Sequence, residues 1–422
     1  MAAALALAPS PQNTSRAAAS PPTGKPWRGY ALLVWLSLLP AILVLVPMVG
    51  YLLGDGVPRW LADKDFANYW VAAKLAATGQ AGDVFGPWDG YWRHLQAAMG
   101  PDFPWHNWSY PPHYLLLMMP LALVGYKAGL VLFLLVTFAV FAGGVRVFAG
   151  IEWRFALLAA SPFVALNAWT AQNGFLLGGL MLLMLGWRER RPVLAGLMLG
   201  LLTVKPQLGL LVPILLLVER RWLVMAVGSA FALALALLSA AAFGMGAWTA
   251  FVTTILPYQS RVMAGLEGTF LWMVPSVFGA LRLSNIPAPA ALGLHLCVAV
   301  PALALTAWTF VRVQDAQLRA CVLAVATFVV APYALNYDLG FFAVALGVFV
   351  ARMRPEFAGE RWLFALAFTL PVLMMVVGRF GVQPAPLVIL PVFAVMLWRL
   401  HAGMAGVSND NSGLPGAIAR PM

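Results

Sequence analysis

The chain has 422 residues, of which 62% are hydrophobic and 10% charged, and its mean hydropathy is +0.85. These values lie far outside the range of soluble globular domains and indicate an all-α polytopic membrane protein. The formal net charge is +11, but the basic residues are scattered singly or in pairs between apolar runs. Membrane topology and anionic headgroups account for that distribution, so we expect membrane lipids as partners and no nucleic acid.

Composition divides the chain into three parts. Residues 1–29 are rich in Pro, Ser and Ala and are predicted to be a disordered cytoplasmic tail. The apolar stretch 30–53 is too long for the core of a signal peptide and is followed by no cleavage motif, so we predict a retained first helix. Residues 30–401 form a single transmembrane domain, and the polar segment 402–422 is predicted to be a disordered tail.

The first external loop is expected at 54–110, where the apolar pattern is weakest. Residues 60–70 are predicted to form a helix with Phe66 and Tyr69 on one face, and this spacing is typical of a helix lying in the membrane interface. A second short helix is predicted around 88–99.

Three apolar segments begin and end in arginine and carry polar residues in the middle. They are Arg154 to Arg188 with its tip at 167–173, Arg191 to Arg220 with its tip at 205–207, and Arg319 to Arg352 with its tip at 332–338. Because Lys and Arg prefer the cytoplasmic side, each segment is predicted to be a hairpin. Each arm of about 12–16 residues would form about 18–24 Å of helix, which is shorter than the hydrocarbon core of about 30 Å. We therefore expect the tips to line a wet cavity that opens outward.

The remaining apolar runs predict full helices. Their ranges are 126–148, 222–243, 290–311, 361–378 and 384–400, the last two forming a fourth hairpin. Residues 244–289 are predicted to form a second external region with a re-entrant piece at 270–283, whereas 111–125 must either cross or dip. The total is about 11 to 13 transmembrane helices.

Several polar residues at these places have two interpretations each. Asp63 and Asp65 suit a site, or the capping of a helix. Lys205 beside Pro206 suits anion binding, or contact with a headgroup. His113 suits a site, or an aromatic belt.

The same ambiguity holds in the other loops. Gln172 and Asn173 suit substrate binding, or hydrogen bonding to their own turn. Asp338 suits a site, or the cap of the helix that follows it, and Arg261 is either a ligand or a solvated residue.

No motif of a soluble enzyme is present: the chain lacks a phosphate-binding glycine loop, a His-x-x-x-His pair and a nucleophile elbow. Cys297 and Cys321 lack the spacing of a metal or redox pair and are predicted to be core thiols. An enzyme of this kind would take an activated substrate such as a lipid-phosphate sugar from the membrane. That chemistry needs a carboxylate as general base and cations on the leaving phosphate.

Asp65 is the candidate base, and Lys205, with His113 or Arg261, the candidate phosphate ligand. A monophosphate leaving group does not require a divalent ion, so no essential metal is expected. A lipid or solute transporter or flippase is the alternative, since short helices around a wet cavity are also transporter features. A membrane scaffold or polymer ligase is a third.

Short motifs occur in a fixed order along the chain. They are Asp65-Phe66-Ala67-Asn68-Tyr69-Trp70 with Gly79, Tyr110-Pro111-Pro112, Gln172-Asn173-Gly174, Lys205-Pro206 and Tyr337-Asp338-Leu339. In this order they resemble bacterial glycosyltransferase family 87, the DUF2029 group, over about residues 30 to 355.

The resemblance implies a C-type glycosyltransferase bundle, no cofactor, and a polyprenyl-phosphate sugar as donor. It implies inverting transfer to a lipid or cell-envelope glycan on the outer face of the bacterial cytoplasmic membrane, with Asp65 matching the catalytic Asp of the first external loop. The residues expected to bind substrate are Tyr69, Tyr110, Gln172, Asn173, Asn336, Tyr337 and Asp338. The sugar is mannose or another hexose or pentose, since Asn336-Tyr337-Asp338 stands where mycobacterial mannosyltransferases carry a His-containing motif.

Overall fold

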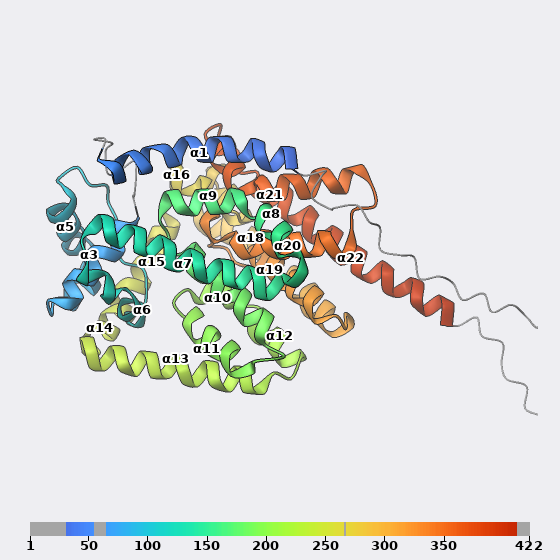
Figure 1. Ribbon diagram of the computed structural model, residues 1–422, viewed down its shortest axis with the longest axis horizontal. Helices are drawn as coiled ribbons and strands as arrows, with labels where there is room; N and C mark the ends of the chain where they lie inside the picture. Colours follow the sequence, from blue (N-terminus) through green and yellow to red (C-terminus); the bar gives the residue numbers. More distant parts are fainter. Residues whose placement is uncertain (1–30, 55–64, 266, 412–422) are drawn as a thin grey trace, which may run out of the picture.

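The computed structural model describes residues 31–54, 65–265 and 267–411. Within these ranges all regular structure is helical, with α-helices, short 3₁₀ turns and one π-helical segment, and no strand occurs. The predicted all-α class is therefore confirmed (Figure 1). The expected tail 1–29 lies outside the described residues, and the first helix, α1, spans Ala31–Leu53.

Five helical stretches in the described ranges are long and apolar enough to cross a membrane. They correspond to α7 (Tyr126–Ala149) with α8 (Trp153–Ala159), α13 (Trp222–Phe243), α18 (Ala288–Arg312), α21 (Ala358–Gly378) and α22 (Ala385–Asn411). All five predicted ranges are confirmed to within a few residues at their starts. Helix α22, however, continues past 401, where we expected a tail to begin.

Shorter apolar helices make up the predicted hairpin arms. They are α9 (Ser161–Thr170), α10 (Gly174–Trp187), α11 (Pro192–Leu202), α12 (Val212–Val218), α19 (Ala316–Val330) and α20 (Gly340–Met353), with α6 (Pro112–Met118) before them. None of these arms reaches the 18 residues of the long helices. The expected total of about 11 to 13 membrane segments therefore corresponds to long and short helices together.

Ion pairs show that the hairpins return to the side from which they start. The Arg188 guanidinium Nε lies 2.8 Å from Glu219 Oε2, which joins the two ends of the segment 188–219. At the tip of the same hairpin, Lys205 Nζ lies 2.6 Å from Asp338 Oδ2 in the tip of the third hairpin. Arms of this length are too short to cross the membrane, so the chain turns back. The arginine-bearing ends of the hairpins, called the hairpin bases below, therefore lie together at one end, and the hairpin tips lie together at the other.

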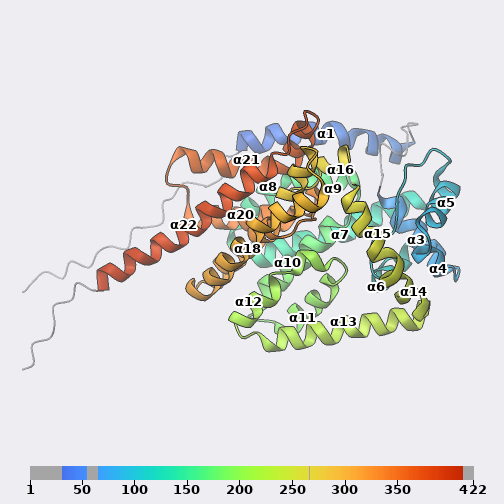
Figure 2. The same ribbon diagram turned by 180° about the vertical axis from the view of Figure 1, so that it is seen from behind.

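The first external region and the beginning of the second lie together at one end of the molecule (Figure 1). The first region contains α3 (Phe66–Ala77), α4 (Ala81–Phe85) and α5 (Trp88–Met99), and the second contains α14 (Met245–Ala250), the π segment η5 (Phe251–Ile255), α15 (Leu256–Ala264), α16 (Thr269–Trp272) and α17 (Val277–Leu283). Figures 1 and 2 show α3, α5, α6 and α14 at one end and the end of α22 at the other.

The aromatic face of α3 differs from our expectation. We placed it in the membrane interface, but Phe66 and Tyr69 are 0% and 1% exposed and pack against protein, including the ring of Phe133 on α7. The prediction of α5 at 88–99 is confirmed. The ring centroids of Phe66 and Tyr69 lie 5.6 Å and 5.3 Å from that of Phe133, so α3 forms part of the protein core.

Glycines allow α7 and α10 to pack closely in the middle of the bundle. A side-chain carbon at Gly144 would lie 2.7 Å from the Gly179 carbonyl oxygen, and one at Gly179 would lie 2.7 Å from the Val140 carbonyl. In a bilayer no hydrophobic force drives helices together, so helices associate through close packing of their backbones at small residues. Cys321 is buried in this core as expected, but Cys297 on α18 is exposed, so its prediction as a core thiol is wrong.

Candidate active site

Asp65 stands immediately before α3, at the position of a helix cap, yet its side chain makes no capping hydrogen bond. Its Oδ1 instead lies 2.9 Å from Nε2 of His106, which comes from the end of the same external loop. One turn further along α3, the Asn68 amide donates to the Asn107 carbonyl at 3.0 Å. This contact fixes the chain beside His106 against α3, so the carboxylate and imidazole are brought together by two anchored segments.

Tyr69 links the external loop to the first hairpin tip. Its hydroxyl donates to the Gln172 side-chain oxygen and lies 3.1 Å from the Tyr110 hydroxyl. Burial, followed by the neighbouring tyrosines Tyr110 and Tyr114, raises the pKa of Tyr69 well above its ordinary value. The hydroxyl therefore stays protonated and serves as a donor. Gln172 also accepts from the Asn173 backbone N–H at 3.3 Å, so this amide makes a hydrogen bond within its own turn, and its binding of substrate stays a prediction.

Gly174 makes the contact between the first and third hairpin tips possible. A side-chain carbon at this position would lie 1.9 Å from the Tyr337 carbonyl oxygen and 2.5 Å from the Asn167 side-chain oxygen. No side chain fits at such a distance, and the carbonyl is backbone that cannot rotate away. The motif Gln172-Asn173-Gly174 thus includes a glycine that the approach of the two tips requires.

Lys205 and Asp338 form a buried ion pair. The ammonium lies 2.8 Å and 2.6 Å from the two carboxylate oxygens, and the side chains are 6% and 0% exposed. The same ammonium lies 4.9 Å from the centre of the Tyr337 ring. Asp338 Oδ2 also accepts from the Leu335 backbone N–H at 2.9 Å, on the near side of the turn rather than in the helix after it. Lys205 is therefore neutralised and held by the third hairpin.

Asn336 lies in the same tip with an unusual environment. It is 0% exposed, and neither its side-chain oxygen nor its nitrogen has a hydrogen-bond partner in the described part of the chain. Its backbone N–H donates to the Met273 carbonyl at 2.8 Å. Buried amides are almost always hydrogen-bonded, so an unmatched one in a polar cluster is a sign of a ligand site.

The charges of two carboxylates, Asp65 of the external loop and Asp338 of the third hairpin tip, act on the hydroxyl of Tyr110. Burial comes first among the causes that raise the pKa of Tyr110 well above its ordinary value, followed by Tyr114, and the charges of Asp338 and Asp65 add to it. Both carboxylates thus contribute to the raised pKa of one buried hydroxyl. The structure brings together Asp65, Tyr69, Tyr110, Gln172, Lys205, Tyr337 and Asp338 from the external loop and three hairpin tips.

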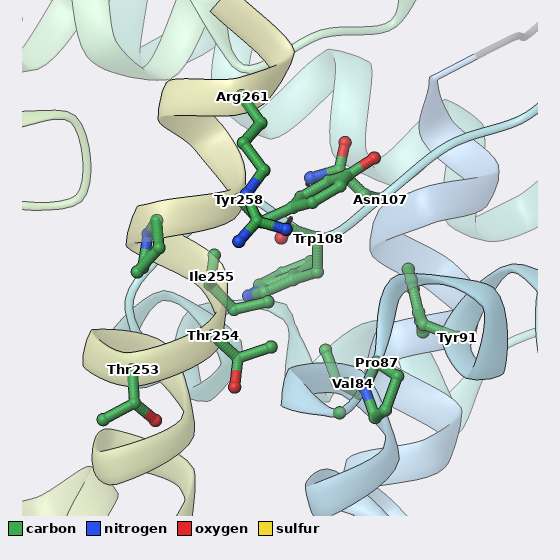
Figure 3. A pocket seen from close by; sticks show the side chains of 12 residues that line it. Val84, Pro87, Tyr91, Asn107, Trp108, Thr253, Thr254, Ile255, Tyr258 and Arg261 are labelled. Atoms are coloured by element: carbon green, nitrogen blue, oxygen red, sulfur yellow. Dashed lines mark hydrogen bonds between the residues drawn. The ribbon is translucent and has the colours of Figure 1, made fainter.

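A cavity of about 230 Å³ opens beside this cluster, between the two external regions (Figure 3). Asn107, Trp108 and Tyr91 line it from the first region, while Tyr258 and Arg261 line it from α15. Its wall also includes the π-helical segment η5, a local distortion that is frequent at functional sites.

The position of this cavity corrects one expectation. We predicted that the hairpin tips line the wet cavity, but Lys205 and Asp338 are packed against one another and the opening is lined by the external regions. The short arms place the tips at the depth where polar groups must find protein partners. Arg261, in contrast, is exposed and lines the cavity.

His113 makes its contacts with a hydroxyl and an aromatic ring. It is 4% exposed, its Nε2 lies 3.2 Å from the Thr203 hydroxyl, and its ring stacks on Trp248 at 5.9 Å. These contacts anchor α6 to the second hairpin. The structure does not place His113 in the hydrogen-bonded cluster around Asp65.

His106 is the residue that sequence reasoning missed. It stands in an aromatic segment, Trp105-His106-Asn107-Trp108, near the end of the first external loop. It is 41 positions from Asp65, and no spacing rule connects residues across a loop of that length. The described ranges contain no group of three or more His, Cys, Asp or Glu side chains arranged to hold a metal ion. Metal independence stays a prediction.

Comparison with known families decides the class. The family model of glycosyltransferase family 87 matches residues 108–332, more than half of the chain. The chain belongs to glycosyltransferase family 87. No curated protein and no solved structure matches it.

Membership makes this protein a multi-pass membrane glycosyltransferase, which acts on a sugar donor and an acceptor. The matched range contains Tyr110, Gln172, Lys205 and Arg261 of the family 87 glycosyltransferase. It begins after Asp65 and His106 and ends before Asn336, Tyr337 and Asp338, so the roles of these residues rest on the geometry described above.

Proposed function

We propose that this enzyme transfers a sugar from a polyprenyl-phosphate donor to a lipid or cell-envelope glycan acceptor, with inversion at the anomeric carbon. The observation that supports it is a half-buried carboxylate, Asp65, at the edge of a polar cluster beside a cavity that an arginine lines. Residues 30–401 act as one catalytic unit, because the cluster takes side chains from α3 and from three hairpins.

In the proposed reaction Asp65 accepts the proton of the acceptor hydroxyl through its Oδ2. The acceptor oxygen forms a bond to the anomeric carbon from the face opposite the phosphate. The bond from that carbon to the phosphate oxygen breaks, and the lipid phosphate leaves with the electron pair. General-base assistance of this kind contributes about 10²–10⁴ in rate.

Arg261 is the proposed ligand of the departing phosphate. Of the three predicted cations it lines the cavity, whereas Lys205 is neutralised by Asp338 and His113 is bonded to Thr203. A guanidinium binds phosphate oxygens in a two-point geometry that an ammonium cannot reproduce. Tyr69, Gln172, Asn173 and Asn336 are proposed to bind the sugar or the acceptor.

The test is sugar transfer by the purified enzyme in detergent, with a radiolabelled polyprenyl-phosphate hexose or pentose and an extract of envelope lipids. We expect a labelled lipid or glycan product of inverted configuration. Arg261→Ala should raise the KM for the donor about tenfold, as expected when a charge-assisted hydrogen bond is lost, while Arg93→Ala on the exposed face of α5 serves as its control. Uptake or flipping of the lipid without transfer would support the transporter alternative instead.

The proposed site faces the periplasm, because the arginine-rich hairpin bases belong on the cytoplasmic side of a bacterial inner membrane. Arg93→Cys and Arg190→Cys report the two ends, in a background with the exposed Cys297 replaced by serine. A membrane-impermeant thiol reagent should label position 93 in intact cells and position 190 after permeabilisation. The reverse pattern would place the active site in the cytoplasm.

A further inference from the structure

We propose that His106 is a positioning residue that holds Asp65 through a charged hydrogen bond, with both imidazole nitrogens protonated. This inference rests on the proposed role of Asp65 as general base. It adds a residue of the first external loop to the reaction and states its protonation state.

The contacts of the imidazole ring, together with the relative acidity of carboxyl and imidazolium groups, assign a proton to each ring nitrogen. Nδ1 lies 3.0 Å from the Pro104 carbonyl oxygen, which accepts hydrogen bonds and donates none, so Nδ1 carries a hydrogen. Nε2 lies 2.9 Å from Asp65 Oδ1. If neither Nε2 nor Oδ1 carried a hydrogen, two lone pairs would face each other at that distance. A carboxyl group is a stronger acid than an imidazolium, so the shared hydrogen lies on Nε2 rather than on Oδ1. A hydrogen on Nε2 satisfies both contacts and makes the ring an imidazolium.

Partial burial strengthens this pair. The His106 and Asp65 side chains are 17% and 19% exposed, and the ring of Phe103 lies 5.3 Å from the imidazole. Charges that are partly withdrawn from water attract each other more strongly than exposed charges. The same loop contains a second pair of the same kind, His94 and Asp83, whose side chains are 36% and 49% exposed.

The pair leaves one carboxylate oxygen of Asp65 for the reaction. Oδ1 is taken by His106, and Oδ2 has no hydrogen-bond partner among the residues that the structure describes. In the transfer step Oδ2 takes the acceptor proton, and His106 keeps both of its own, so no proton is lost or gained by the imidazole. The hydrogen bond fixes the carboxylate plane and so the direction of the free oxygen, the task that an orienting group performs in a catalytic triad.

In the part of the chain that the structure describes, the titratable groups near the pair are two tyrosines and the arginine of the adjoining cavity. Tyr110 and Tyr337 are the groups on which the Asp65 charge acts, and both are buried hydroxyls. Arg261 lines the adjoining cavity, which Asn107, the residue after His106 in the chain, also lines. Of these groups only the imidazole changes charge near neutral pH when it is in water. An alkaline loss of activity therefore reports the loss of its second proton.

The test compares His106→Gln, His106→Ala and the control His94→Gln. A glutamine amide nitrogen donates to Asp65 from a similar position but does not titrate. We expect His106→Gln to lower kcat less than about tenfold and His106→Ala to lower it about 10- to 100-fold, within the range of general-base effects, both with KM nearly unchanged. The alkaline fall of kcat should disappear in His106→Gln and persist in His94→Gln. An unchanged pH profile in His106→Gln overturns the proposal.

A second measurement does not depend on catalysis. The chain has five histidines, so nitrogen-15 NMR of histidine-labelled enzyme in nanodiscs identifies the His106 ring by its loss in His106→Gln. Both ring nitrogens should carry hydrogen near neutral pH, and one should lose it in Asp65→Asn. A ring with one proton in the native enzyme overturns the inference even if sugar transfer is observed. A doubly protonated ring without sugar transfer leaves the pair intact and rejects the proposed function.

Discussion

The two ends of the hairpins treat their charges differently. At the base, the carboxylate of Glu219 is 1% exposed and is shared by Arg188, Arg221 and Arg319, which lie 2.8 Å, 3.6 Å and 3.6 Å from it. At the tip end, Lys205 has one carboxylate, Asp65 has one imidazole, and Asn336 has no side-chain partner among the described residues.

This difference indicates that charges at the hairpin base serve stability, whereas polar groups at the tip end serve the candidate site. A buried carboxylate with three cations has no capacity left for a ligand, so the base joins hairpins to one another. The tip end keeps unmatched polar atoms and a cavity beside them, and such groups are retained where a ligand completes them. The same chemical types thus hold the bundle at one end and form the candidate site at the other.

The largest expected effect is on catalysis at the tip end. Asp65→Asn keeps the shape of the side chain but removes its basic character, so kcat for sugar transfer should fall about 100-fold or more. The enzyme should fold normally, judged by its elution as a single species. Asp83→Asn, at the exposed pair of the same loop, is the control and should keep its activity. Normal turnover in Asp65→Asn would remove this residue from the mechanism.

The next effect is on stability in the hairpin tips. Lys205→Met leaves Asp338 buried without its cation and should cost about 3–5 kcal/mol, measured by thermal unfolding in detergent. The double variant Lys205→Met with Asp338→Asn removes both charges and keeps an acceptor for the Leu335 N–H, so it should recover most of that loss and most of the transfer activity.

The double variant also tests the division of roles among the cations. Recovery of folding without recovery of sugar transfer would show that Lys205 or Asp338 contacts a substrate in addition to the other member of the pair. If Lys205 is that residue, the contrast between Lys205 and Arg261 drawn above would be wrong.

At the base we expect a stability effect without a catalytic one. Glu219→Gln leaves three arginines without their shared carboxylate and should cost about 3 kcal/mol. The kcat of the folded fraction should remain within about twofold of normal, because the residue lies at the opposite end of the hairpin from Lys205. Glu189→Gln, whose side chain is 47% exposed, is the matched control and should cost about 0–1 kcal/mol. A large fall in kcat for Glu219→Gln would show that the two ends are coupled.

The smallest expected effect is that of chelation. Incubation with millimolar EDTA should leave the rate of sugar transfer unchanged, because a monophosphate leaving group held by a guanidinium needs no divalent ion. The assay compares treated enzyme with and without added magnesium or manganese. Loss of activity that either ion restores would require a metal in the leaving-group chemistry.

The sequence by itself determined the helices, the hairpins and the class of membrane protein. Periodicity and length set the ranges of α7, α13, α18 and α21, because a bilayer demands long uninterrupted apolar runs. Arginines at both ends of short runs determined the hairpins. The residues Asp65, Tyr69, Tyr110 and Gln172 were identified as candidates from local motifs, and the structure places them in one cluster.

Tertiary structure alone decided the partners of those residues. The contact of Asp65 with His106 spans 41 positions, and that of Lys205 with Asp338 spans 133. No local rule of capping or snorkelling predicts either, because both follow from how separate segments are anchored. The burial of α3 and the position of the cavity likewise depend on packing between elements distant in sequence. A motif therefore names a side chain, whereas its charge state and its access to a ligand depend on the neighbours that the fold brings to it.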